Sequence, residues 1–75
     1  MTKDEKRQNI LEAVGEMTGK LLDATTASIE VRFKKRSVNV APIAIQETLA
    51  DLREDGVLSS SGSGSKNNPI RYFLA

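Results

Sequence analysis

The densest group of basic side chains in this sequence lies at residues 32–36. Four cations fall within five positions, at Arg32, Lys34, Lys35 and Arg36. Such a cluster can hold phosphate groups, although cations near the end of a helix also offset the helix macrodipole without binding a ligand. A β-branched and turn-prone segment, residues 37–40, follows the cluster. We favour the phosphate-binding interpretation because of this turn.

Acidic side chains gather at Asp51, Glu54 and Asp55. Asp51 and Asp55 are four residues apart and would share one helix face. A carboxylate pair needs a further ligand or base to bind a metal or to catalyse a reaction, yet the chain has neither His nor Cys. The serine run at residues 59–61 lacks an activating base for the same reason. The sequence therefore predicts a solvated acidic face, no metal, no cofactor and no enzymatic activity.

Length and charge narrow the class of protein. The chain has 75 residues, with 11 basic and 10 acidic side chains. This length predicts one domain over residues 1–75, and the near-neutral balance argues against binding by bulk charge alone. No apolar run is long enough for a membrane span or a signal peptide. The absence of Cys fits a cytoplasmic protein.

The first helix is predicted over residues 3–18. Thr2 and Glu5 have the spacing of a capping box. Apolar side chains recur at helical spacing, at Ile10, Leu11, Val14 and Met17. Gly19 is expected to end the helix in the C′ position. The apolar pair Leu21-Leu22 is interpreted as a short strand that pairs with the C-terminal hairpin.

A second helix is expected to begin near residues 25–28 and to end near Arg36. Thr25, Thr26 and Ser28 are the candidate caps. Ile29 and Phe33 are four residues apart and should face the core together.

The third helix has the clearest boundaries. Pro42 is favoured at the first position of a helix, and Gly56 is expected to end this helix. The buried stripe is expected to consist of Ile45, Leu49 and Leu52.

Two short strands should close the chain, over residues 57–59 and 70–74, with a loop rich in Ser, Gly, Lys and Asn between them. Tyr72 and Phe73 are adjacent on the second strand, so one of them should be buried and the other exposed. Val40 and Ile43 would add apolar surface beside the third helix. With an exposed aromatic, that surface would suit a dimer contact or a partner protein.

This order of elements resembles the winged helix-turn-helix family. The resemblance is carried by Ile29 and Phe33, by Ile45-x-x-x-Leu49-x-x-Leu52-x-x-x-Gly56-Val57-Leu58, and by Tyr72 and Leu74. It covers nearly the whole chain. It implies an α+β fold, a three-helix winged helix-turn-helix with a C-terminal two-stranded β-hairpin wing, whose loop spans about residues 59–69.

The resemblance also implies a partner, double-stranded DNA, with the third helix in the major groove and the wing on flanking backbone. Gln46 and Thr48 would reach base edges, and the remaining positions would hold phosphates. Carried over to this chain, the DNA-binding residues are Lys34, Lys35, Arg36, Ser37, Asn39, Gln46, Thr48, Lys66, Asn67 and Arg71. For Arg71, an ion pair with an acid such as Glu54 is the alternative.

Two functions stay open at this point. The first is a small DNA-binding protein, nucleoid-associated in a bacterial or archaeal host, that regulates transcription or assists replication or partition of a mobile element. It would grip the DNA backbone, because the third helix has no Arg or Lys before Arg53. The alternative is a protein-interaction module within a replication or repair assembly, favoured by the apolar residues between Val40 and Ile45. A homodimer is compatible with both, whereas a membrane or a small-molecule substrate is not expected.

Overall fold

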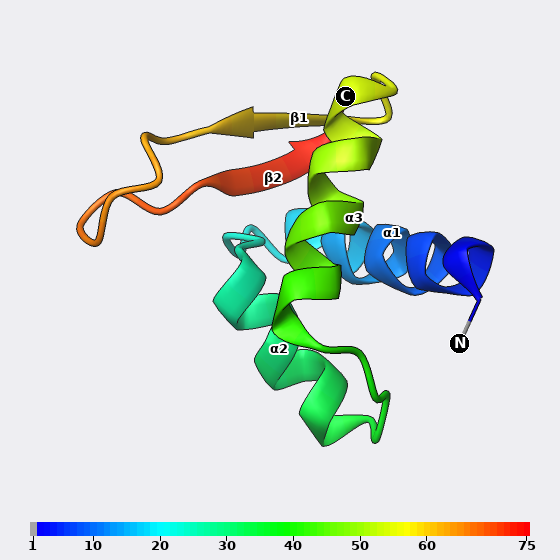
Figure 1. Ribbon diagram of the computed structural model, residues 1–75. Helices are drawn as coiled ribbons and strands as arrows, with labels where there is room; N and C mark the ends of the chain where they lie inside the picture. The colour runs from blue at the N-terminus through cyan, green and yellow to red at the C-terminus, as the bar shows by residue number, and fades with distance from the viewer. Residues whose placement is uncertain (1) are drawn as a thin grey trace.

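Three helices precede a two-stranded antiparallel sheet in the computed structural model, which describes residues 2–75 (Figure 1). The elements are α1 (Lys3–Gly19), α2 (Thr26–Lys35), α3 (Pro42–Glu54), β1 (Leu58–Ser61) and β2 (Arg71–Leu74). This layout confirms the predicted α+β, winged-helix-like fold. Met1, which the predicted domain 1–75 includes, lies outside the described residues.

The core lies where the three helices meet the base of the hairpin. α1 and α2 both pack against α3, and α1 and α3 also contact the sheet. The largest side chains that are fully buried are Ile10, Val14, Ile29, Ile45, Leu49, Leu52 and Leu58. The predicted stripe of α3 is therefore confirmed, as is the burial of Phe33. Of the adjacent aromatics, Tyr72 is buried and Phe73 is exposed.

Each helix begins with a local signal that the sequence carries. Thr2 caps α1 by accepting a hydrogen bond from the Glu5 amide. Thr25, one of three predicted candidates, caps α2 in a reciprocal capping box with Ser28. Pro42 occupies the first turn of α3, where its missing N–H leaves no bond unmade.

All three helices end in the same hydrogen-bonded reversal, the Schellman motif. At α1, for example, the amide of Leu22 donates to the Met17 carbonyl at 2.8 Å. The residues with positive φ in the C′ position are Leu21 (60°), Ser37 (57°) and Gly56 (79°). The prediction for Gly56 is confirmed, but that for Gly19 is wrong, because α1 includes Gly19 and reverses at Leu21.

The hairpin pairs Leu58 with Leu74 and Ser60 with Tyr72, starting one residue later in each strand than predicted. Ala24 adds an antiparallel bridge to Tyr72, whose amide donates to the Ala24 carbonyl at 2.8 Å. The strand predicted at Leu21-Leu22 is therefore wrong. Reversal of the chain at Leu21 brings Ala24, not the leucine pair, to the edge of β2.

The wing loop depends on glycine. Gly62 has φ of 104°, and a Cβ placed on it would collide with the carbonyl oxygen of Pro69. The two arms of the loop therefore approach too closely at this point for any residue that has a side chain.

Candidate nucleic-acid interface

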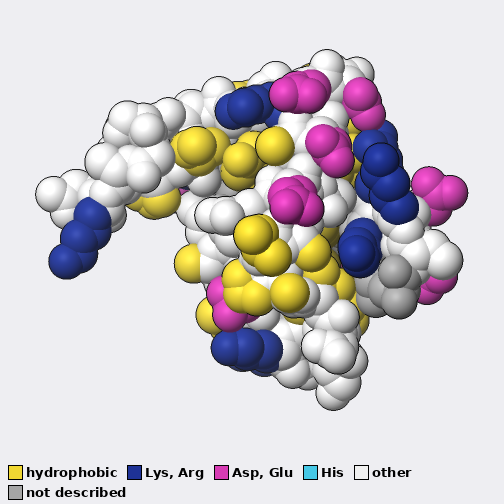
Figure 2. All heavy atoms as spheres, viewed as in Figure 1, with side chains coloured by type: hydrophobic (Ala, Val, Ile, Leu, Met, Phe, Trp, Pro, Cys, Tyr) yellow, Lys and Arg dark blue, Asp and Glu magenta, His cyan; other side chains and the backbone are white. Residues whose placement is uncertain are grey.

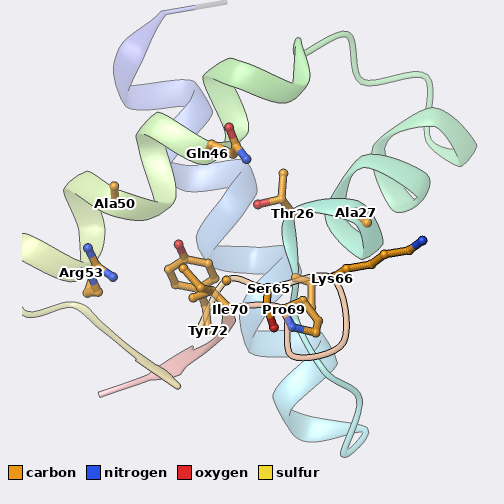
Figure 3. Close-up of a pocket in the computed structure, with 12 residues that line it drawn as sticks. Thr26, Ala27, Gln46, Ala50, Arg53, Ser65, Lys66, Pro69, Ile70 and Tyr72 are labelled. Carbon is orange, nitrogen blue, oxygen red and sulfur yellow. The ribbon is translucent and has the colours of Figure 1, made fainter. Parts of the chain in front are cut away.

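An open groove of about 670 Å³ lies between α3, the first turn of α2 and the wing (Figure 3). α3 lines it with Gln46, Ala50 and Arg53, which repeat at i, i+4 and i+7 on one flank of the helix. The other lining residues are Thr25, Thr26, Ala27, Gly64, Ser65, Lys66, Pro69, Ile70 and Tyr72. The groove thus joins parts of the chain that are far apart in sequence.

The polar lining of this groove consists of donors and cations. Arg53 and Lys66 contribute positive charge from opposite elements, and no Asp or Glu is among the lining residues. Arg53 also donates to the Ser60 hydroxyl at 3.4 Å, which holds its guanidinium near the hairpin. Arg53 is not among the DNA-binding residues predicted from the sequence, although its spacing from Gln46 along α3 was a usable signal.

The outward face of α3 has a different character. Ile43, Glu47 and Glu54 lie opposite the buried stripe and are all exposed. Figure 2 shows acidic side chains gathered over α3, with basic side chains toward the periphery and at the wing tip. Phosphate is therefore favoured in the groove and disfavoured on the outward face of the same helix.

Thr48 does not face this surface, and the prediction that it reads bases is wrong. Its side chain is buried, and its hydroxyl donates to the Ala44 carbonyl at 2.8 Å. The reason is helical geometry, because Thr48 lies on the same stripe as Ile45, Leu49 and Leu52.

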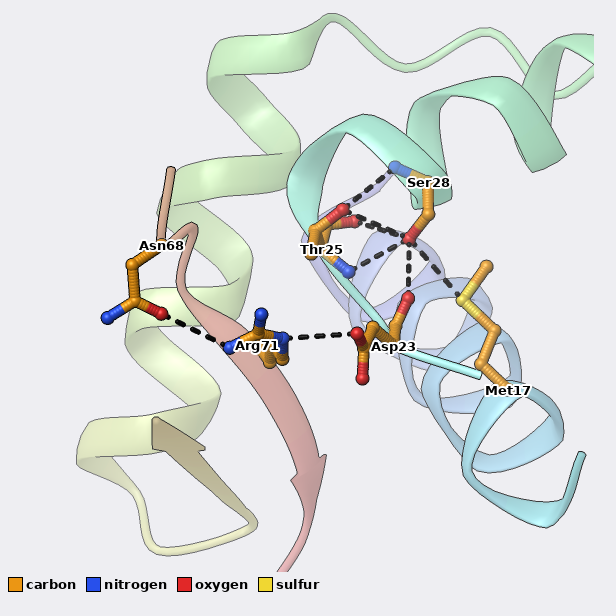
Figure 4. Close-up of polar contacts among 6 residues, drawn as sticks. All are labelled: Met17, Asp23, Thr25, Ser28, Asn68 and Arg71. Carbon is orange, nitrogen blue, oxygen red and sulfur yellow. Dashed lines mark hydrogen bonds and ion pairs between the residues drawn. The ribbon is translucent and has the colours of Figure 1, made fainter. Parts of the chain in front are cut away.

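The Arg71 side chain has two side-chain partners in the same chain (Figure 4). Its Nε lies 3.1 Å from an Asp23 carboxylate oxygen, and its Nη1 donates to the Asn68 side chain at 3.3 Å. Both side chains of this ion pair are partly or fully exposed, so the role of Arg71 as a phosphate contact stays a prediction that requires it to exchange Asp23 for a phosphate. The acid that pairs with it is Asp23, not Glu54.

In the basic cluster predicted at the end of α2, Lys34, Lys35 and Arg36 are exposed and Arg32 is partly buried, and three of the four have ion-pair partners. Lys34 lies 3.4 Å from Glu30, and Arg36 lies 3.3 Å from Glu16, which also pairs with Arg32. Lys35 makes no ion pair within residues 2–75. Exposed pairs of this kind contribute little to stability, so these cations stay free to exchange partners.

The turn from α2 into α3 offers further donors. Ser37 and Asn39 are exposed there. The N-cap residue of α3, Ala41, makes no side-chain bond to the helix, so no side chain caps the first amides of α3. Lys66 and Asn67 are also exposed, at the tip of the wing. Of the predicted site residues that are exposed, one group lies at this turn, Gln46 and Lys66 line the groove, and Asn67 follows Lys66 on the wing.

Comparisons with known proteins leave the family open: no family model, no curated protein and no solved structure matches this chain. Within residues 2–75, no group of three or more Asp, Glu, His or Cys side chains is placed to hold a metal ion. No helix in the same part of the chain is long and apolar enough to cross a membrane.

Proposed function

We propose that this protein binds double-stranded DNA, with a sugar-phosphate backbone seated in the groove between α3 and the wing. The observation that carries the proposal is the lining of that groove. It has cations on both sides, Arg53 and Lys66, and no carboxylate. Gln46, Thr26 and Ser65 add neutral donors. Charged and neutral donors around an open channel suit phosphate oxygens.

A second backbone contact is proposed at the turn before α3. Lys34, Lys35 and Arg36 would approach phosphates there, with Ser37 and Asn39 as hydrogen-bond donors. The first amides of α3, which no side chain caps, would add the positive end of the helix dipole.

Base reading would be sparse in this arrangement. Gln46 is the one predicted base reader that stays exposed, because Thr48 is buried. The acidic side chains on the outward face of α3 make no favourable contact with phosphates. A backbone grip fits an accessory factor in replication or partition of a mobile element better than a regulator that reads one operator.

The direct test is a fluorescence anisotropy titration with random-sequence duplex DNA at low salt. Non-specific binding should be detectable by tens of micromolar protein. Combining Arg53→Ala with Lys66→Ala should weaken binding to all duplexes alike and should reduce the log–log salt slope by about 2. Lys3→Ala with Lys6→Ala removes two charges from α1 and serves as the matched control. Absence of binding by the unaltered protein would refute the proposal.

A second candidate is a protein-interaction module in a replication or repair assembly. The outward face of α3 favours it, because Ile43 is 66% exposed on the same face of the helix as Glu47 and Glu54. That surface suits a partner with apolar and basic side chains. Absence of DNA binding at low salt, in the same anisotropy titration, would support this function instead.

A further inference from the structure

Leu21 combines two unfavourable features. Its backbone has φ of 60°, in the left-handed region that favours glycine, and its side chain is 94% exposed. The corresponding C′ position of α3 is occupied by Gly56. A leucine in this position therefore strains the backbone and gains almost no burial within its own chain.

Leu21 is one of the residues that line a shallow hollow of about 300 Å³. Leu22 and Phe73, which are 58% and 40% exposed, line the same hollow together with Ala24. Phe73 and Tyr72 are neighbours on β2 and so face opposite sides of the hairpin. Tyr72 borders both the proposed DNA groove and this hollow, but the two share no other lining residue, so they are different surfaces.

The rim of this hollow carries balanced charge. Asp23 and Arg71 both line it and pair with each other at 3.1 Å (Figure 4). The carboxylate and the guanidinium of this pair neutralise each other, so together they add no net charge to the border of the apolar surface. Two identical copies can therefore meet there without repulsion between like charges from this pair.

We propose that the surface formed by Leu21, Leu22 and Phe73 is the contact between two copies of this chain. A projecting side chain beside a hollow, on one surface, is self-complementary under two-fold symmetry. In such a dimer, the Leu21 side chain of each copy enters the hollow of the other. The strained backbone at Leu21 then has a function, because it holds the side chain outward.

The dimer leaves the proposed DNA groove of each copy accessible. It also doubles a contact surface that is small in a single copy. Three large apolar side chains make less contact than a standard interface of roughly 800 Å² per partner. We therefore expect weak self-association, with a dissociation constant on the order of tens of micromolar.

The proposal is tested by sedimentation equilibrium without DNA, so its outcome does not depend on DNA binding. The mass of the unaltered chain should rise from 8.2 kDa toward twice that value between about 5 and 500 μM. Leu21→Gly should weaken self-association at least tenfold. The same substitution should raise the melting temperature at about 5 μM, where the chain is monomeric, because glycine relieves the strained backbone.

Ser37→Gly is the matched control, because Ser37 has the same C′ role and a φ of 57° at the end of α2. It should raise the melting temperature and leave the association unchanged. Phe73→Thr, a substitution that keeps strand propensity, should weaken association without relieving strain.

An NMR dilution series locates the contact. Amide shifts of Leu21, Leu22 and Phe73 should change with concentration, whereas those along the outward face of α3 should not. A chain that stays at 8.2 kDa up to about 500 μM would overturn the proposal. So would unaltered association of the Leu21→Gly variant, or shifts confined to α3.

Discussion

At the scale of single residues, Thr48 and Gln46 show how two positions on one helix differ in role. Both were expected to face DNA. Gln46 lines the groove, whereas Thr48 is buried and bonds the Ala44 carbonyl. A buried threonine that bonds the carbonyl four residues earlier contributes to packing, and its hydroxyl adds little net stability because that carbonyl already accepts a helix bond.

Thr48→Val should therefore leave DNA affinity unchanged and alter the free energy of unfolding by no more than about 1 kcal/mol. Gln46→Ala, two residues away and exposed, should instead weaken binding by a few-fold. Urea denaturation and anisotropy titrations measure the two quantities on the same samples. A loss of affinity in Thr48→Val with unchanged stability would show that the hydroxyl reaches DNA after all.

At the scale of elements, the helix ends decide where the chain turns. α1, α2 and α3 all close with the same hydrogen-bond pattern, but only α3 uses glycine in the left-handed position. Gly19 lies in the last turn of α1, with nothing within 4 Å of an added Cβ. Gly56 has equal space but a φ of 79°.

Alanine should thus have opposite effects at these two glycines. Gly19→Ala should stabilise the protein by about 0.5 kcal/mol, because alanine is the better helix former. Gly56→Ala should destabilise it by about 1 kcal/mol, because the left-handed backbone strains any residue with a Cβ. Urea melts of both variants give the comparison. Destabilisation by Gly19→Ala would restore Gly19 as the residue that ends α1.

At the scale of the whole molecule, the net charge does not describe how the charged side chains are placed on the surface. A net charge of +1 conceals an acidic outward face on α3, a groove without carboxylates and a basic turn at the end of α2. The proposed DNA-binding cations lie in two groups, one at the turn before α3 and one in the groove between α3 and the wing. In the proposed complex, each group would supply affinity and neither would supply much sequence information.

Lys34→Ala with Lys35→Ala should weaken binding to every duplex by a similar factor and should flatten the salt dependence by up to about 2 in slope. The reduction should be smaller if Lys34 stays paired with Glu30 in the complex. Titrations of two unrelated duplexes over a salt series measure both effects. Unchanged affinity at low salt would remove the basic turn from the interface and leave the groove as the sole contact.

Much of this fold could be predicted because its signals are local. Pro42, the stripe of Ile45, Leu49 and Leu52, and Gly56 act within a few residues of the bonds that they control, so the boundaries of α3 follow from the sequence. For the cap of α2 the sequence left three candidates, and it predicted that one of Tyr72 and Phe73 is buried without choosing between them; the structure selects Thr25 and Tyr72. Even Thr48 carried a usable signal, since its position completes the buried stripe.

Only the tertiary structure decided the features that depend on distant segments. The pairing of Arg71 with Asp23 spans 48 positions, as does that of Arg7 with Asp55. Neither partner can be chosen from spacing, because an exposed side chain pairs with whichever charge the fold brings near. The same applies to the groove, which is formed by α2, α3 and the wing together. It also applies to the chain reversal at Leu21, which brings Ala24 beside β2. The sequence by itself determined the elements, and long-range packing determined which of their side chains share a surface.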